Sequence, residues 1–298
     1  MRNYLRLLVG FVLLLSFASC VDAVEPRFQY ETGFLLVEGR ITDVNEYNEI
    51  QVARSEFRFG RYVLDPVAGA RVTVVDQAGN ETAWAQEGMS SQYRPPADWA
   101  ATVGDTYFVR VVTPEGELVE SEPSIVPEPV PISNLRVDFQ QEAYFSDARE
   151  RFIPAFRLLV DLDDPAGERN YYQYRFRAFQ QLRVCARCYQ SRWRNGECIA
   201  SADTRSVERW DYVCDRPCWS FDDGDGIYFF NDEFADGRRI TGLEAGRYDY
   251  DFPGGLLFNL QQYSINQAAY DYNVVLRDLT ENSGGLNAPL PAALVGNL

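Results

Sequence analysis

Five cysteines in the second half of the chain have a spacing that could carry chemistry. They form a Cys-x2-Cys pair and a Cys-x3-Cys pair with one cysteine between them: Cys185, Cys188, Cys198, Cys214 and Cys218. Four thiolates from two such pairs could hold zinc in a tetrahedral site. In an oxidising compartment they would instead form disulfides that stabilise a segment with little core of its own. A redox Cys-x2-Cys centre is a third reading, but it would need a thioredoxin-like βαβ context that this sequence lacks.

The N-terminus favours disulfides, because it predicts export. Residues 1–6 carry two arginines and no acid, and the apolar run over residues 7–17 has signal-peptide length but is too short to span a bilayer. The run ends at Phe17–Cys20, which resembles a bacterial lipobox, although Leu is usual where Phe17 stands. We expect cleavage before Cys20 and a lipid on its thiol; an ordinary signal peptide cleaved nearby is the alternative. The disulfide pairing cannot be derived from sequence, and five cysteines leave one over.

The titratable residues exclude several classes of function. The chain has no histidine, which excludes Ser-His-Asp triads, Cys-His pairs and histidine metal sites. Its 28 basic residues are all arginine and face 44 acids, so that the formal net charge is −16. Such a surface repels nucleic acid and anionic lipid, and we expect no nucleic-acid partner. A carboxylate pair could act without histidine, but no pair stands out among so many acids.

An arginine-rich stretch reverses this charge locally, since no acid occurs between residues 170 and 196. If the arginines converge, they form a docking patch for an acidic partner or ligand. The alternative is a set of outward-facing strand positions neutralised by acids from elsewhere in the fold. The candidate patch residues are Arg175, Arg177, Arg183, Arg187, Arg192 and Arg194.

An acidic segment, Asp222–Gly226, invites a calcium interpretation. It lacks the full spacing of a calcium-binding loop and has no glutamate at the closing position. We therefore interpret it as a plain acidic turn, and we expect neither a metal nor a cofactor in this protein.

The elements that must position these residues are mainly strands. Aromatic residues make up 14% of the chain, and apolar residues alternate with polar ones in many short segments. In residues 70–74, for example, Ala70, Val72 and Val74 share one face of a strand. Further strands are expected over residues 34–42, 50–55, 104–112, 118–121, 135–139, 156–162 and 170–179, and one helix over residues 260–279.

The spacing of these strands predicts a mostly β protein with two domains. The first is an immunoglobulin-like or carboxypeptidase-regulatory-like β-sandwich, and the second is a β-rich domain with a cysteine-rich insert. Four prolines in nine residues mark the boundary between them. We expect a signal peptide at residues 1–20, a tether at 21–32, the β-sandwich at 33–122, a linker at 123–131, and the β-rich domain at 132–298 with its insert at 183–226.

The order of these features resembles a known family. The segments "LLVEGRITD", "VAGARVTVVDQAGN", "GDTYFVRVVTPEGELVESEP", "VPEPVPI", "DLDDPAGERNYYQYRFR" and "AYDYNVVLRDLTENSGGLNAPLPAALVGNL" are similar to the Bacteroidota outer-membrane lipoproteins grouped as domain of unknown function 4249. The resemblance covers nearly all of the mature chain and carries over no catalytic residue. It implies a lipoprotein encoded beside TonB-dependent outer-membrane receptors. Family members usually continue past the final Gly-Asn, which would make this chain truncated, and their cysteine-rich inserts vary.

These observations lead to one expected function and two alternatives. We expect a non-enzymatic lipoprotein, held by a lipid on Cys20 at the periplasmic or cell-surface face of the outer membrane. It would be an accessory or ligand-binding partner of a TonB-dependent receptor, because a membrane tether raises the effective concentration of a membrane partner. One alternative is a structural or adhesion lipoprotein of the envelope with no small ligand, and the other is a carboxylate-based hydrolase.

Overall fold

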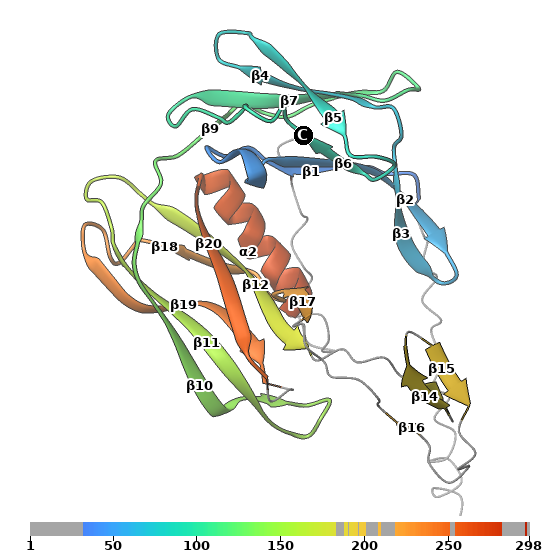
Figure 1. The fold of residues 1–298 in the computed structure, drawn as a ribbon. Helices are drawn as coiled ribbons and strands as arrows, with labels where there is room; N and C mark the ends of the chain where they lie inside the picture. The colour runs from blue at the N-terminus through green and yellow to red at the C-terminus, as the bar shows by residue number, and fades with distance from the viewer. Residues whose placement is uncertain are drawn as a thin grey trace, which may run out of the picture.

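The computed structural model describes residues 32–182, 188–189, 191–195, 197–200, 208–209, 218–250, 254–281 and 296. The protein is mostly β, as the sequence predicts, and its antiparallel sheets form two sandwiches that lie one above the other in Figure 1. Among the described residues, no helix has both the length and the hydrophobicity that crossing a bilayer requires.

The first sandwich is one curled nine-stranded sheet, with strand order β1-β2-β6-β5-β4-β7-β8. Two strands lie off this path, because β3 pairs with β2 and β9 pairs with β7. The strands are β1 (Leu35–Arg40), β2 (Glu49–Arg58), β3 (Arg61–Pro66), β4 (Arg71–Asp76), β5 (Glu81–Gln86), β6 (Gln92–Arg94), β7 (Thr106–Val112), β8 (Leu118–Glu120) and β9 (Ser124–Ile125), and a 3-10 turn, η1 (Asn45–Tyr47), precedes β2.

The core of the first sandwich follows the predicted alternation. Ala70, Val72 and Val74 are all buried and pack with Trp84 from the neighbouring strand. The hydroxyl of Tyr93, a fully buried side chain, donates a hydrogen bond to the Val67 carbonyl at 3.1 Å. The curled sheet therefore encloses a core of apolar side chains, and burial of their surface stabilises the sandwich.

The second sandwich packs two sheets face to face. One sheet has the order β10-β11-β19, and in the other β12 pairs with β17, β18 and β20. The elements are β10 (Ile132–Ser146), β11 (Arg151–Asp163), β12 (Tyr171–Leu182), β17 (Cys218–Asp223), β18 (Tyr228–Asn231), β19 (Arg239–Asp249), β20 (Leu256–Ile265) and helix α2 (Gln267–Glu281), with the short strands β13 (Cys188–Tyr189), β14 (Ser191–Arg194), β15 (Glu197–Ala200) and β16 (Glu208–Arg209) between β12 and β17.

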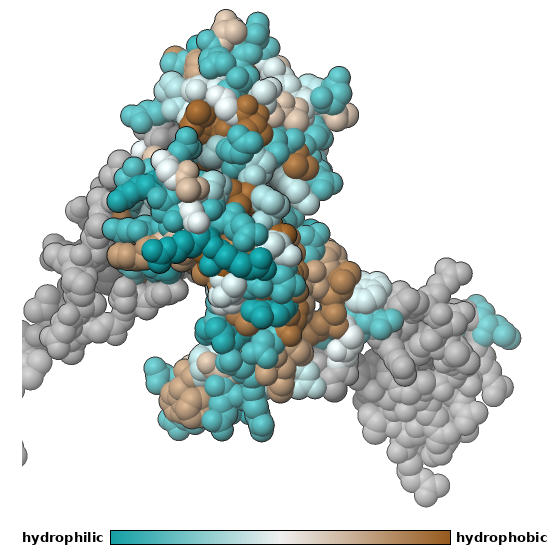
Figure 2. All heavy atoms as spheres, turned by 90° about the vertical axis from the view of Figure 1, so that its left-hand side faces the viewer, coloured by the Kyte–Doolittle hydropathy of each residue, from teal (hydrophilic) through white to brown (hydrophobic). Residues whose placement is uncertain are grey.

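Strand β12 has one face in the second core and one face under helix α2. Tyr172 and Tyr174, two positions apart in the strand expected over residues 170–179, are both buried in the core between the sheets. On the opposite face, Gln173 donates a hydrogen bond to Asn273 of α2 at 3.1 Å. Strand β10, at the edge of the β10-β11-β19 sheet, is more exposed to solvent than β12. Its residues Leu135, Val137 and Phe139 are each nearly half exposed. On the side of the molecule shown in Figure 2, hydrophobic side chains reach the surface between hydrophilic ones.

The helix begins later than the sequence predicts. Residues 260–265, expected as helix, belong to β20, which pairs with β12 from Leu256 to Ile265. The helix starts at Gln267, directly after Asn266, whose side-chain oxygen accepts a hydrogen bond from the Ala269 amide at 2.8 Å. An asparagine in this position is a favourable N-terminal cap, and it separates the strand from the helix.

The proline-rich segment between the sandwiches is packed at both ends. Val126 is buried in the first core and Val130 in the second. The Gln262 amide donates a hydrogen bond to the Val130 carbonyl at 2.6 Å, and the Asn266 amide donates one to the Ser124 hydroxyl at 2.6 Å. The two sandwiches are therefore in contact. On the second sandwich, the contact surface includes the end of β20 and Asn266, which follows it.

Candidate functional site

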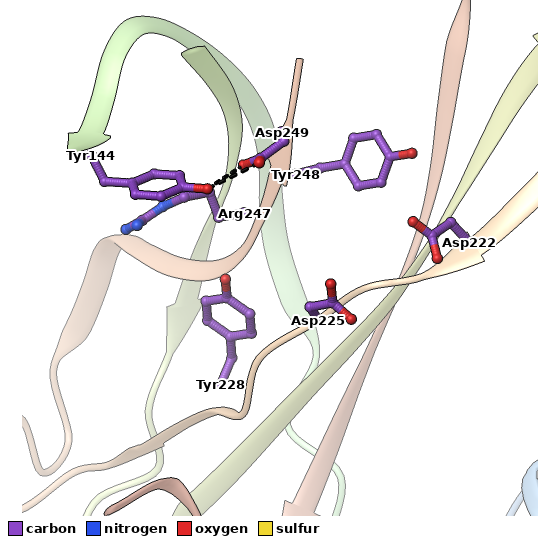
Figure 3. A pocket seen from close by; sticks show the side chains of 7 residues that line it. All are labelled: Tyr144, Asp222, Asp225, Tyr228, Arg247, Tyr248 and Asp249. Atoms are coloured by element: carbon purple, nitrogen blue, oxygen red, sulfur yellow. Dashed lines mark hydrogen bonds between the residues drawn. The ribbon is translucent and has the colours of Figure 1, made fainter. Parts of the chain in front are cut away.

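A pocket of about 300 Å³ lies on the second sandwich, where strands from both of its sheets come together (Figure 3). Pockets of this size are at the lower end of the range that holds small molecules. Its lining consists of Tyr144 from β10, Asp222 from β17, Asp225 from the turn that follows, Tyr228 from β18, and Arg247, Tyr248 and Asp249 from β19.

Two of the lining carboxylates belong to the acidic turn, and packing on a core residue holds that turn in place. The Gly224 amide donates a hydrogen bond to the Phe176 carbonyl at 2.9 Å. A Cβ atom on Gly224 would lie 2.2 Å from the Phe176 ring, so only glycine fits there. Asp222 and Asp225, on either side of Gly224, line the pocket. Asp223 points elsewhere and forms an ion pair with Arg177 at 2.6 Å.

The other wall of the pocket is a hydrogen-bonded pair of side chains. The Tyr144 hydroxyl donates to both carboxylate oxygens of Asp249 at 2.9 Å, as Figure 3 shows. Burial, and then this bond to a carboxylate, raise the pKa of Tyr144 above its ordinary value. Tyr144 therefore stays a neutral donor at physiological pH, and it holds Asp249 in a fixed orientation.

The charge of the pocket is negative. Its single guanidinium, that of Arg247, is bound by Glu244 at 2.6 Å from outside the lining and lies 5.5 Å from the centre of the Tyr144 ring. No ion pair of Asp222 or Asp225 occurs within the part of the chain that the structure describes. Aromatic rings beside carboxylates attract cations, both through the ring face and through charge. The arrangement can therefore bind a positively charged group.

A second acidic cluster lies in the same sandwich, at the other end of β11 from the strand position that pairs with Asp249. One carboxylate oxygen from each of Asp164, Asp232 and Asp236 lies within 4.8 Å of those of the other two. Asp164 accepts hydrogen bonds from the Tyr172 hydroxyl at 2.5 Å and from the Gly237 amide at 3.1 Å. Burial raises the pKa of Asp164, and the two bonds oppose this rise. Oxygen ligands of this kind suit calcium. In this cluster, however, the hydrogen bond between Asp164 and Gly237 already joins the β11–β12 connection to the β18–β19 connection.

The candidate arginine patch is only partly described. Arg175 and Arg177 lie on the same face of β12, opposite the core. Arg177 is neutralised by Asp223 and lies 4.8 Å from the centre of the Phe221 ring. Arg175 is exposed by its surface area, but it lies close to Arg40 of the first sandwich, and partial desolvation, and then the charge of Arg40, lower its pKa below the usual value. These two arginines therefore face different surroundings.

The remaining predicted site residues cannot be placed with their side chains. Cys20, Cys185, Cys214, Arg183 and Arg187 lie outside the described residues, as do the side chains of Cys188, Cys198, Cys218, Arg192 and Arg194. The lipid, the disulfides and the convergence of the arginines therefore stay predictions.

Sequence reasoning found only part of the pocket. It identified Asp222–Gly226 as an acidic turn, but it did not connect this turn with Tyr144 or with Arg247–Asp249. A weak signal was present, because aromatic and acidic residues alternate over residues 248–251. Their meeting with Tyr144 depends on the pairing of β10 with β11 and of β11 with β19, which no local pattern shows.

Comparison with known proteins identifies the family. None of the curated proteins compared with this chain matches it. The model of a family described as a domain of unknown function, DUF4249, matches residues 21–298, which is all of the chain after the apolar N-terminal segment and Cys20. The match includes both sandwiches, the acidic turn and the cysteine-rich insert. This chain therefore belongs to the DUF4249 family.

Proposed function

We propose that this protein is a non-enzymatic, ligand-binding lipoprotein of the outer membrane and an accessory subunit of a TonB-dependent receptor. In this proposal the lipid on Cys20 holds the protein beside its membrane partner. The second sandwich presents the pocket between Tyr144 and the acidic turn to a positively charged group of the ligand. The first sandwich is the scaffold that joins the tether to the binding domain.

The observation that carries the binding function is the composition of the pocket. Tyrosine rings form much of its wall, and its one arginine is already bound to Glu244. The carboxylates of Asp222 and Asp225 have no such partner among the described residues. A site of this kind favours a small organic cation over an anion, because the cation gains both ring contact and charge pairing.

The lipid anchor supports the receptor part of the proposal. A chain held in the plane of the membrane meets an outer-membrane protein at a high effective concentration, so a weak interface suffices. The N-terminal features that predict the lipid are the short apolar run and the small residues before Cys20.

The receptor part is tested by co-purification. The tagged full-length protein is expressed in its native host, and membranes are solubilised with mild detergent before affinity capture. We expect an outer-membrane receptor to be captured with the wild-type protein, and far less of it with Cys20→Ala, which lacks the lipid. If the wild-type protein captures no outer-membrane receptor, the accessory role is refuted.

The binding part is tested by calorimetric titration of the purified protein with tetramethylammonium, and with an uncharged branched alcohol of similar size as the control ligand. We expect the cation to bind and the alcohol not to bind. Asp225→Asn should weaken the binding of the cation by removing one charge from the lining. Asp138→Asn, which changes an acid outside the pocket lining, is the matched control and should have no effect. Equal titration of the cation and the alcohol would refute a cation site.

A further inference from the structure

The hairpin of β2 and β3 ends in an exposed phenylalanine. Arg58 pairs with Arg61, which leaves a two-residue turn of Phe59 and Gly60. Both turn residues have positive φ, 52° for Phe59 and 78° for Gly60, which is the pattern of a type I′ turn. The Phe59 side chain is 99% exposed, so it contacts almost nothing in the folded chain.

Neither backbone geometry nor packing explains a phenylalanine at this position. Type I′ turns favour asparagine, aspartate or glycine at the first central residue, because other side chains are strained at positive φ. The strain at Phe59 is not offset by burial, since its ring is in solvent. A strained residue that does not stabilise its own fold points to a function for its side chain.

The hairpin lies beside the point where the N-terminal tether enters the fold. The Gly33 amide donates a hydrogen bond to the Ser55 carbonyl at 2.8 Å, and the Arg54 guanidinium donates one to the Gly33 carbonyl at 2.8 Å. Phe59 lies four positions after Ser55, a distance of about 13 Å along the strand direction. Cys20 precedes Gly33 by 13 residues, which span at most about 45 Å when fully extended. A lipid on Cys20 would therefore keep this end of the sandwich close to the bilayer.

Other exposed apolar side chains lie at the same end. Phe34, at the entry point, is 55% exposed, and Met89, in the β5–β6 turn, is 91% exposed. That turn lies at this end because the Val52 amide bonds to the Ser91 carbonyl at 2.8 Å. Arg61, next to the tip, has no ion pair among the described residues and is suited to a lipid phosphate. In Figure 1 the β2–β3 hairpin projects from the right-hand side of the first sandwich.

We propose that the tip of the β2–β3 hairpin, with Phe59 at its end, is a second membrane contact that inserts into the interface of the bilayer holding the lipid on Cys20. The inference rests on the lipid anchor of the proposed function. One apolar side chain is too small to bind this acidic protein to a membrane by itself, so the tip acts only after the lipid has brought it there. The two contacts together fix the orientation of the first sandwich on the membrane.

The experiment uses the full-length lipidated protein, reconstituted into vesicles of phosphatidylethanolamine and phosphatidylglycerol with or without brominated acyl chains. A tryptophan is introduced at the tip by Phe59→Trp. The control is Phe234→Trp, because Phe234 is 88% exposed and lies in the β18–β19 connection, on the opposite side of Figure 1 from the hairpin. The signal of the native tryptophans is measured in the wild-type protein and subtracted. Thermal unfolding confirms that both variants are folded.

We expect the brominated lipid to quench the added tryptophan at the tip and to shift its emission to the blue, and we expect neither effect in the control. If the wild-type protein floats with the vesicles but the two added tryptophans respond alike, the membrane contact is refuted while the anchor stands. If the wild-type protein does not float, the lipid anchor fails and the contact that depends on it fails too. Cys20→Ala should not float, since the tip alone does not hold the protein.

Discussion

Replacing Phe59 with asparagine should make the protein more stable. The left-handed backbone conformation costs an ordinary residue about 1–2 kcal/mol, and asparagine tolerates it much better. The phenylalanine ring is 99% exposed, so its removal loses almost no buried apolar area. The relief of backbone strain therefore decides the sign of the change in stability. We expect the free energy of unfolding to rise by about 1 kcal/mol, which for a large domain corresponds to an increase of about 2–4 °C in Tm.

The assay is thermal and urea-induced unfolding of the purified protein, followed by circular dichroism. Phe234→Asn is the matched control, because Phe234 is similarly exposed at 88% but has no positive φ. This control removes an exposed phenyl ring without relieving backbone strain, and its stability should equal that of the wild-type protein. The comparison separates the effect of the turn from any general effect of removing a surface aromatic.

Two results would refute the reasoning. A loss of stability in Phe59→Asn would mean that the phenyl ring packs on another part of the protein. An equal gain in both variants would mean that the removal of an exposed aromatic, and not the turn, is responsible. The predicted result, a gain in Phe59→Asn alone, would show that Phe59 is kept at the tip at the expense of stability.

Three further predictions concern the second sandwich. Gly224→Ala should lower the free energy of unfolding by about 1–3 kcal/mol in a urea titration, since the new methyl group overlaps Phe176; wild-type stability would contradict this close contact. Hydrogen bonds lower the pKa of Asp161, so its charged form stabilises the fold at neutral pH, and this contribution is lost as the pH falls through the lowered pKa. Asp161→Asn should therefore be destabilising at pH 7 and nearly neutral in acid, and a pH-independent loss would contradict the argument. Burial raises the pKa of Asp164, and the hydrogen bond from Tyr172 partly offsets this rise by stabilising the charged carboxylate. Tyr172→Phe removes that bond, so the loss of stability that it causes should grow as the pH rises from acid to neutral. Unfolding curves in which this loss does not grow with pH would contradict the prediction.

Local patterns predicted strands of both sandwiches, because each sandwich buries one face of its sheets, but β3, β18 and β19 were not expected. The alternation of Tyr172 and Tyr174 with polar residues is enough to assign β12 and its buried face. The same reasoning placed the helix start too early. Nothing in residues 260–265 alone shows that they pair with β12, and that pairing makes them a strand.

The candidate site was harder to predict than the fold, because its residues meet only through long-range pairing. Tyr144 and Asp249 lie 105 positions apart and form a hydrogen bond only because β11 lies between their strands. The cluster around Asp164 has the same origin, since its members come from two separate connections. Residue types indicated the chemistry of these side chains, but the register of the sheets decides which of them touch.

The pairing of β12 with β17 has a consequence for how the family can vary. Leu182 and Cys218 are direct partners in this pairing, so the segment that joins them begins and ends at paired positions of the sheet. The entropy of closing such a loop grows only slowly with its length. The segment can therefore be lengthened, shortened or exchanged without changing the register of the sandwich. A short turn joining β12 to β17 should yield a folded minimal protein, and the same junction is a natural position for grafting a foreign binding loop.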